Sequence, residues 1–335
     1  MNKSCILAFP GQGSQYVGMT KNMQDDQDCQ ALLKQADNIL GVPLTQYMLE
    51  GPTETLTLTK NAQPAIVLHA YLYWNKLRPI FKKHQIQVGA VLGHSVGEFS
   101  ALLAAESLSL EQALKLTQFR GTVMQEAVAV GVGSMYAILR APTELVEVAC
   151  REVSNDSNGQ WIVTPANYNS PEQVVISGHK EACLLAIEWL EKNFNGRLRT
   201  IELNVSAPFH CPLMKPAEQK FAQMINQLEI RPNQIPYYAN VNAVRYKTGT
   251  PVQTIRDNFI AQISGSVLWD QSVQKFDTNP IIIEVGPSKV LQGLLKKSLP
   301  TASLFSLDQG LPLQEELEQL EHWIDEMAKA SGGQQ

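Results

Sequence analysis

The sequence predicts an α/β protein, with a parallel sheet in a large domain and a smaller domain inserted into it. An apolar stretch at 88–92 runs into a sharp turn and then into a helix-like stretch, the order found in α/β-hydrolases. Residues 280–287 are nearly all apolar, as expected of a central parallel strand. Residues 131–204 show the order β-α-β-β-α-β of a split βαβ unit. We therefore expect an α/β-hydrolase-like large domain and a ferredoxin-like small domain.

The composition is that of a globular protein with a large core. The chain has 335 residues, of which 44% are hydrophobic and 18% charged, and its net charge is −5. This charge offers no general basic field for nucleic acid, and no apolar run reaches the ~18 residues of a membrane span. The N-terminus lacks a signal-peptide pattern, and the five cysteines are widely spaced without a C-x-x-C pair. We expect a cytoplasmic monomer that binds no metal, nucleic acid or membrane.

Apolar periodicity predicts the elements that precede the insertion. We expect strands at 6–9 and 88–92, and helices at 24–40, 62–80, 98–105 and 110–128. The loop at 10–15 is rich in glycine, but its spacing fits neither a Rossmann nor a P-loop fingerprint.

The insertion and the segment after it carry further predicted elements. We expect strands at 134–139, 161–163, 173–178, 200–205, 236–241 and 280–287, and helices at 142–154, 179–193 and 312–330. The predicted division is 1–130 with 205–320 for the large domain, 131–204 for the small domain, and 321–335 for the C-terminal helix end and tail.

The turn between the second strand and the helix reads Gly-His-Ser-Val-Gly, from Gly93 to Gly97. In a strand-turn-helix context, G-x-S-x-G is typical of a nucleophile elbow, which presents its serine at a helix N-terminus. The alternative is a Gly-Ser loop that merely contains Ser95. The flanking strand and helix favour the elbow, so Ser95 is the candidate nucleophile.

A nucleophilic serine needs a general base, and the chain has six histidines. His210 follows a Pro-containing crossing between the two predicted domains and comes after the serine in the chain. His94 neighbours Ser95, so its side chain should diverge from the serine. Elimination therefore favours His210 as the base. No acidic third member is marked out by its context, so a carbonyl oxygen could orient the imidazole instead.

Arg120 falls on the apolar stripe of the predicted helix at 110–128. A buried arginine needs an anionic partner. Two alternatives are open at this stage, an internal ion pair with an aspartate or glutamate and a guanidinium fork that holds a substrate carboxylate.

The ordered motifs closely resemble those of the malonyl-CoA:acyl carrier protein transacylase family, which includes polyketide acyltransferases. The resemblance covers roughly residues 5–300. The motifs are Phe-Pro-Gly-Gln-Gly-Ser-Gln at 9–15, Gln-Pro-Ala at 63–65, Gly-His-Ser-Val-Gly-Glu at 93–98, Arg-Gly and Met-Gln within 120–125, the segment 167–178, Phe-His at 209–210 and Glu-Val-Gly-Pro at 284–287.

The resemblance implies a ping-pong transfer of malonyl from coenzyme A to Ser95, and then to the phosphopantetheine thiol of an acyl carrier protein. His210 would be the base, and backbone N–H groups of Gln12 and Val96 would form the oxyanion hole. Arg120 would bind the malonyl carboxylate. No cofactor is implied beyond these two substrates.

Further site residues follow from the same resemblance. The main-chain carbonyl of Gln262 would orient the histidine, although the Gly-Ser-Val at 265–267 departs from the family's frequent Asn-Pro-Val. The pocket would be lined by Gln63, His94, Met124, Asn167 and Phe209. The bulk of Phe209 resembles that of malonyl-type enzymes, so we expect malonyl to be preferred over methylmalonyl.

Other functions on the same fold stay open as alternatives. A hydrolase that clears acyl chains from carrier proteins would share Ser95 and His210 but would have no use for Arg120. A non-catalytic docking module and a plain esterase fit the motifs less well. Because few residues precede the first strand, we expect a discrete, trans-acting enzyme of fatty acid or polyketide synthesis.

Overall fold

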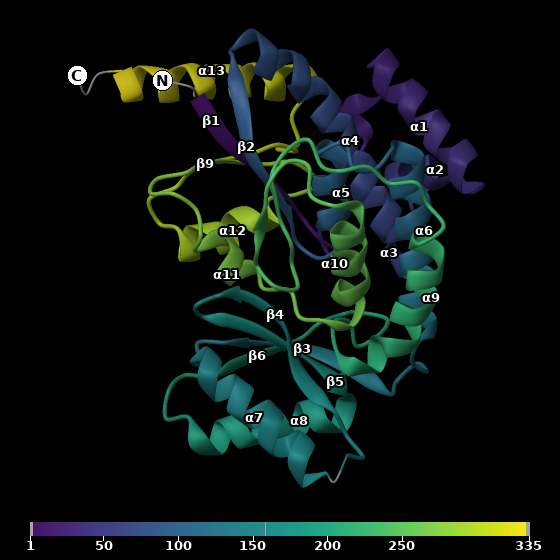
Figure 1. The fold of residues 1–335 in the computed structure, drawn as a ribbon, viewed down its shortest axis with the longest axis vertical. Helices are drawn as coiled ribbons and strands as arrows, with labels where there is room; N and C mark the ends of the chain where they lie inside the picture. The colour runs from purple at the N-terminus through teal and green to yellow at the C-terminus, as the bar shows by residue number, and fades with distance from the viewer. Residues whose placement is uncertain (1–2, 158, 333–335) are drawn as a thin grey trace.

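The larger of two sheets lies at the centre of the upper part of the molecule in Figure 1, in a computed structural model that describes residues 3–157 and 159–332. Its strands have the order β10-β9-β1-β2-β7-β8, and all neighbours are parallel except β7 and β8. The strands are β1 (Lys3–Phe9), β2 (Ile86–Gly93), β7 (Tyr237–Tyr238), β8 (Arg245–Tyr246), β9 (Ile281–Glu284) and β10 (Ser303–Ser306).

Helices cover both faces of this sheet. Successive side chains of a strand point to opposite faces, so apolar residues of one strand pack against the helices on both sides. On β1, Leu7 and Phe9 join the main core, whereas Ala8 faces a smaller core formed with α11 and α12. The helices outside the second sheet are α1 (Gln27–Leu40), α2 (Leu44–Glu50), α3 (Thr53–Thr57), α4 (Thr59–Lys83), α5 (Gly97–Ala104), α6 (Leu110–Glu126), α9 (Lys215–Ile225), α10 (Val252–Ser264), α11 (Trp269–Val273), α12 (Val290–Ser298) and α13 (Leu313–Gly332), with short 3₁₀ turns at Lys21–Met23 and Pro212–Met214.

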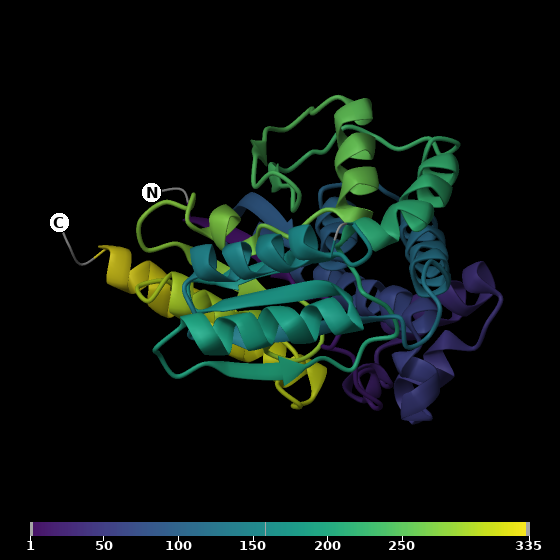
Figure 2. The same cartoon turned by 90° about the horizontal axis from the view of Figure 1, so that it is seen from below.

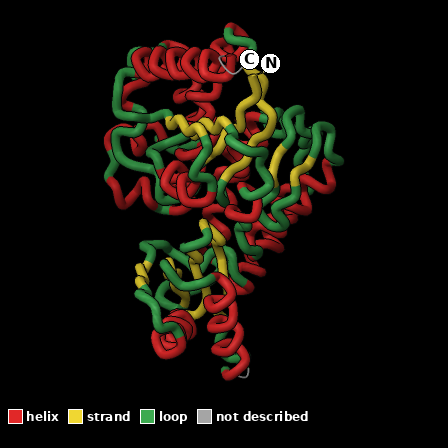
Figure 3. The backbone as a smooth tube through the Cα atoms, turned by 90° about the vertical axis from the view of Figure 1, so that its left-hand side faces the viewer, coloured by secondary structure: helices red, strands yellow, loops and turns green. Residues whose placement is uncertain are grey.

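The second sheet is antiparallel, with the order β4-β5-β3-β6, and forms a separate lobe in Figure 3. Its elements are β3 (Gly133–Leu139), α7 (Thr143–Asp156), β4 (Val163–Ser170), β5 (Gln173–His179), α8 (Lys180–Asn193) and β6 (Arg199–Glu202). Tyr136 and Ile138 pack with α7 and α8, whereas Met135 and Ala137 join the main core. Figure 2 shows α7 and α8 side by side on one face of this sheet. Its other face therefore contributes to the core beside the large sheet.

The predicted fold class is confirmed, since a mainly parallel sheet is accompanied by a small four-stranded antiparallel sheet. The division into domains at 131–204 stays a prediction. Four strand predictions were wrong in extent. The strand expected at 200–205 spans Arg199–Glu202, and the one expected at 280–287 spans Ile281–Glu284. The strand expected at 161–163 begins at Val163 and runs to Ser170, and the one expected at 236–241 has only two residues. The helix expected at 312–330 spans Leu313–Gly332, and residues 333–335 of the expected tail lie outside the described residues.

A polar network, buried at Asp308 and Glu316, ties the C-terminal part of the chain to the loop after β1. The Tyr16 hydroxyl donates to Asp308 at 2.7 Å, and the Ser288 backbone N–H donates to the same carboxylate at 2.8 Å. Glu316 accepts from the Asp308 backbone N–H at 2.9 Å and from the Tyr73 hydroxyl at 2.6 Å. The loop that carries Gln12 is thus held by hydrogen bonds to residues near the C-terminal end of the sequence.

No helix within residues 3–157 and 159–332 is both long enough and apolar enough to cross a bilayer.

Candidate active site

Ser95 lies in a sharp turn between β2 and α5, in the left-handed region of backbone conformation with a φ of 51°. A side chain on Gly93 would collide with the backbone of Gly97, and one on Gly97 would collide with the Phe9 carbonyl. Both positions therefore require glycine, and the turn is held closed by a 2.9 Å hydrogen bond from the Gly97 N–H to the His94 carbonyl. The strained conformation of a non-glycine residue here matches a nucleophile elbow.

The loop after β1 lies directly against this turn. A Cβ on Gly11 would come within 2.6 Å of the His94 carbonyl oxygen, so the loop backbone approaches the elbow closely. The Gln12 side chain donates to the Thr59 hydroxyl at 3.3 Å. Val96 caps the N-terminus of α5, where N–H groups lack intrahelical acceptors. The role of Gln12 and Val96 as oxyanion donors stays a prediction.

Ser95 and His210 are in direct contact, with 2.7 Å between Oγ and Nε2. His210 Nδ1 lies 2.9 Å from the Gln262 carbonyl oxygen and 3.2 Å from that of Gly265. Because carbonyl oxygens only accept hydrogen bonds, Nδ1 carries the proton and Nε2 offers its lone pair to the serine. The main-chain carbonyls of Gln262 and Gly265 therefore accept the hydrogen bond that the carboxylate of a catalytic triad would accept.

The carboxylates considered as a third member lie elsewhere. Asp156, Glu172 and Glu202 are all exposed on the small lobe. His210 itself has a φ of 58° and follows Pro208, which packs against Gly133 at the start of β3. The two chain segments that join the lobes thus lie together and place His210 beside the elbow.

Arg120 projects from α6 into the same site and is 1% exposed. Its Nη2 donates to Ser95 Oγ at 3.2 Å and to Gln262 Oε1 at 2.9 Å. Its Nε is buried without a hydrogen-bond partner among the described residues, and none of their carboxylate oxygens lies within 4.0 Å of the guanidinium. The alternative of a direct internal ion pair is therefore not formed, and part of the guanidinium is left for a ligand.

Glu98 and Asn240 belong to the site, although the sequence analysis gave neither a role there. Glu98 Oε2 accepts from the Gln262 side chain at 2.6 Å and from the Asn240 backbone N–H at 3.3 Å. The Asn240 side chain accepts from the Ser95 N–H at 2.8 Å and donates to the Gly93 carbonyl at 2.7 Å. Burial raises the pKa of the Glu98 carboxyl to about 8. The motif at 93–98 includes Glu98, but nothing in the sequence indicated its role because its partners lie more than a hundred residues away.

The residues expected to line the pocket are not all brought to Ser95. His94 turns away from the serine, with Nε2 at 2.7 Å from Asn169 Oδ1 and its ring 5.5 Å from that of Trp269. Its side chain therefore diverges from Ser95, as expected, and its role as a pocket residue stays a prediction. Asn167 lies in β4, where it bridges to Val267.

Three further pocket residues are buried near the site. Gln63 lies one turn after Thr59 on α4, and its Oε1 has no hydrogen-bond partner among the described residues. Met124 lies one turn after Arg120 on α6, and Phe209 precedes His210. All three side chains are buried. Their role in selecting the acyl group stays a prediction.

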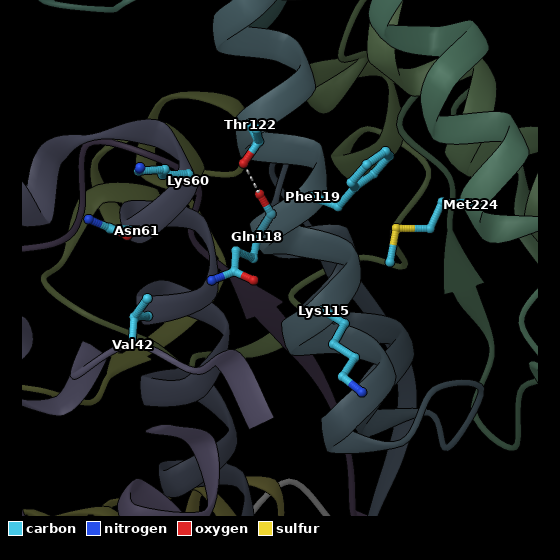
Figure 4. Close-up of a pocket in the computed structure, with 8 residues that line it drawn as sticks. All are labelled: Val42, Lys60, Asn61, Lys115, Gln118, Phe119, Thr122 and Met224. Atoms are coloured by element: carbon cyan, nitrogen blue, oxygen red, sulfur yellow. Dashed lines mark hydrogen bonds between the residues drawn. The ribbon is translucent and has the colours of Figure 1, made fainter. Parts of the chain in front are cut away.

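A separate pocket with a volume of about 300 Å³ opens on another face of α6. Figure 4 shows Phe119 and Thr122 among the side chains around it. The lining residues are Val42, Lys60, Asn61, Lys115, Gln118, Phe119, Thr122 and Met224. Neither Ser95 nor Arg120 is among them, so α6 presents one face to this pocket and another to the serine.

Comparison with known proteins matches the acyl transferase domain to residues 7–330. The chain belongs to the acyl transferase family. This acyltransferase is 38% identical to the malonyl CoA-acyl carrier protein transacylase of Bacillus subtilis over 300 residues, which are 89% of this chain and 90% of that protein.

Solved structures give the same family. The malonyl CoA-acyl carrier protein transacylase of Clostridium perfringens is 31% identical, with a TM-score of 0.87 and coverage of 99% of this chain and 100% of that chain. A malonyl-transacylase solved in complex with the acyl-carrier protein of a type II polyketide synthase is 33% identical, with a TM-score of 0.84 and coverage of 95% and 99%. The acyltransferase fold is therefore shared along nearly the whole chain.

The pH dependence of this acyltransferase follows from the environment of His210. Burial and the nearby Arg120 lower the pKa of His210 to about 3, so the imidazole stays neutral well below its ordinary titration. We expect kcat/KM for acyl loading to stay level between about pH 5 and pH 7, below the titration of Glu98, without the fall near 6.5 of an ordinary histidine base. Rapid-quench measurement across this range tests the expectation, and an acid limb centred near 6.5 would contradict it.

The same depressed pKa has a consequence for stability. In the unfolded chain His210 binds a proton below its ordinary pKa of 6.5, whereas in the folded protein it stays neutral down to about 3. Its contribution to the free energy of unfolding therefore decreases as the pH falls through this interval.

Proposed function

We propose that this acyltransferase moves a malonyl group from coenzyme A to Ser95 and then to the phosphopantetheine thiol of an acyl carrier protein. One observation carries the proposal: Ser95 Oγ lies 2.7 Å from the His210 imidazole and 3.2 Å from the Arg120 guanidinium. The imidazole of His210 and the buried guanidinium of Arg120 thus both contact the hydroxyl of Ser95. The relatives named above, which act on malonyl-CoA and acyl carrier protein, support the same assignment.

The first half-reaction acylates the serine. The Ser95 oxygen attacks the thioester carbonyl while its proton passes to His210 Nε2. Backbone N–H groups of Gln12 and Val96 would stabilise the tetrahedral oxyanion. Collapse of this intermediate breaks the carbon–sulfur bond, and His210 returns the proton to the sulfur of coenzyme A. In the second half-reaction the carrier-protein thiol attacks the ester by the same steps in reverse.

Arg120 gives the transfer its selectivity for a dicarboxylic acyl group. A guanidinium can hold a carboxylate by two charge-assisted hydrogen bonds, which an acetyl group cannot form. The unpartnered Nε supports this role, since a buried donor without an acceptor is otherwise unfavourable.

Intact-mass measurement tests the proposed function. The protein is incubated with malonyl-CoA or with acetyl-CoA, first alone and then with holo acyl carrier protein, while coenzyme A release is followed. We expect a stable malonyl adduct with a single burst of coenzyme A, followed by transfer when the carrier protein is added. Steady release without a lasting adduct, or a preference for acetyl, would favour the hydrolase instead.

Phe209 is expected to make the wild type select malonyl over methylmalonyl. One extra methyl group in a tight apolar pocket changes selectivity by about tenfold or more. Phe209→Ala should therefore raise kcat/KM for methylmalonyl-CoA relative to malonyl-CoA, in competition assays read by mass. Faster loading of methylmalonyl by the wild type would refute this role.

We also propose that the reaction takes place in the cytoplasm, with either a fatty acid or a polyketide carrier protein as acceptor. All five cysteines are free and buried, which suits a reducing compartment.

A further inference from the structure

The Gln262 side chain lies between two buried ionisable residues, Arg120 and Glu98, and its contacts define the orientation of its amide. Oε1 accepts from Arg120 Nη2 at 2.9 Å. Nε2 donates to the Ser95 carbonyl at 3.0 Å and to Glu98 Oε2 at 2.6 Å. A third and longer contact runs from Nε2 to Asn240 Oδ1 at 3.4 Å. A flipped amide would direct N–H groups at the guanidinium and an oxygen at these acceptors, so the observed orientation is the one that satisfies the partners.

Glu98 supplies the shortest of the three acceptor contacts for Nε2. It lies in the first turn of α5, yet its hydrogen bonds run to Gln262 and Asn240 rather than to the N–H groups of its own helix. The residue is 1% exposed, so solvent does not replace a lost contact. Because the Glu98 acceptor is buried, its hydrogen bond has a large effect on the orientation of the Gln262 amide.

We propose that Glu98 is a positioning residue that holds Arg120, through the amide of Gln262, for binding of the substrate carboxylate. The inference rests on the proposed function, because that carboxylate is the one of the malonyl group. Among the described residues, the Glu98 carboxyl makes no hydrogen bond to Ser95 Oγ or His210, and its shorter hydrogen bond runs to Gln262 rather than to the Asn240 backbone N–H. It therefore contributes to the choice between malonyl and acetyl rather than to the chemical step.

The test replaces the acceptor and compares two substrates. Glu98→Met removes both carboxyl oxygens at similar volume, Glu98→Gln keeps one acceptor oxygen, and Ser100→Ala is a matched control that removes another buried polar group from α5. We expect Glu98→Met to lower kcat/KM for malonyl-CoA by about tenfold, mainly through KM, as for a weakened contact to a charged group. Acetyl loading should change by no more than about twofold, and Glu98→Gln should restore malonyl selectivity.

A double-mutant cycle separates positioning from a merely structural role. In the Arg120→Ala background, Glu98→Met should leave the malonyl-to-acetyl ratio unchanged, because the group that it positions is gone. If Glu98→Met does not fold, Gln262→Met gives the same test, since it keeps the main-chain carbonyl for His210. An equal fall with both substrates, or an unchanged ratio in the single variants, would overturn the proposal. Failure of the wild type to load malonyl would instead overturn the proposed function.

Discussion

Replacing Ser95 with alanine is expected to abolish the malonyl-enzyme and to lower kcat by about five to six orders of magnitude. The serine oxygen is the atom that would carry the acyl group, and alanine leaves no side-chain nucleophile at 2.7 Å from His210 Nε2. Intact mass after incubation with malonyl-CoA gives the direct measurement, and coenzyme A release gives the rate.

A matched control keeps this experiment interpretable. Ser107 is also a buried serine, at 1% exposed, but it lies outside the site, so Ser107→Ala should retain full loading. Circular dichroism and thermal unfolding would show that Ser95→Ala keeps the fold. A malonyl adduct that persists in Ser95→Ala would move the nucleophile to another residue.

Replacing Arg120 with alanine is expected to lower kcat/KM for malonyl-CoA by about a hundredfold, which corresponds to about 3 kcal/mol for a lost charge-assisted pair. Acetyl-CoA forms no such pair, so its loading should rise relative to that of malonyl-CoA. The result is read as the ratio of the two kcat/KM values, which cancels any shared effect on Ser95 or on folding.

Arg120→Lys is the informative companion to this variant. It keeps the charge but loses the planar fork, so its ratio should fall between those of the wild type and Arg120→Ala. Its contact to Gln262 would also be lost in part. If malonyl and acetyl loading fall equally in both variants, Arg120 is a structural residue and the selectivity lies elsewhere.

The strands and helices with strong periodicity could be predicted from the sequence, whereas the short or irregular ones could not. The order of elements in the small lobe and the turn at Ser95 were correct. Strand β4 was placed too early because Pro165 and several Asn and Ser residues disfavour a strand. It lies at the edge of its sheet, where a proline is tolerated, with an irregular register between Pro165 and Asn167.

The candidate site could be predicted where one local motif carries the chemistry. Ser95 follows from its turn and His210 from elimination; the two side chains lie 2.7 Å apart, and their catalytic roles stay a prediction. The bridge from Arg120 through Gln262 to Glu98 could not be predicted, because its residues lie on three elements whose approach depends on the packed core. Sequence patterns report the periodicity of one element, not the contacts between elements.

The hydrogen bond between Tyr16 and Asp308 limits the order in which parts of the site can form during synthesis. These residues form a hydrogen bond although they stand 292 positions apart, and the loop that carries Gln12 depends on it. Ribosomes release the N-terminal part of a chain first, so this loop emerges early and Asp308 emerges late. A nascent chain that already contains Ser95 and His210 still lacks the fixed loop beside them. The loop beside the active site therefore gains this support only after the segment around Asp308 has been synthesised.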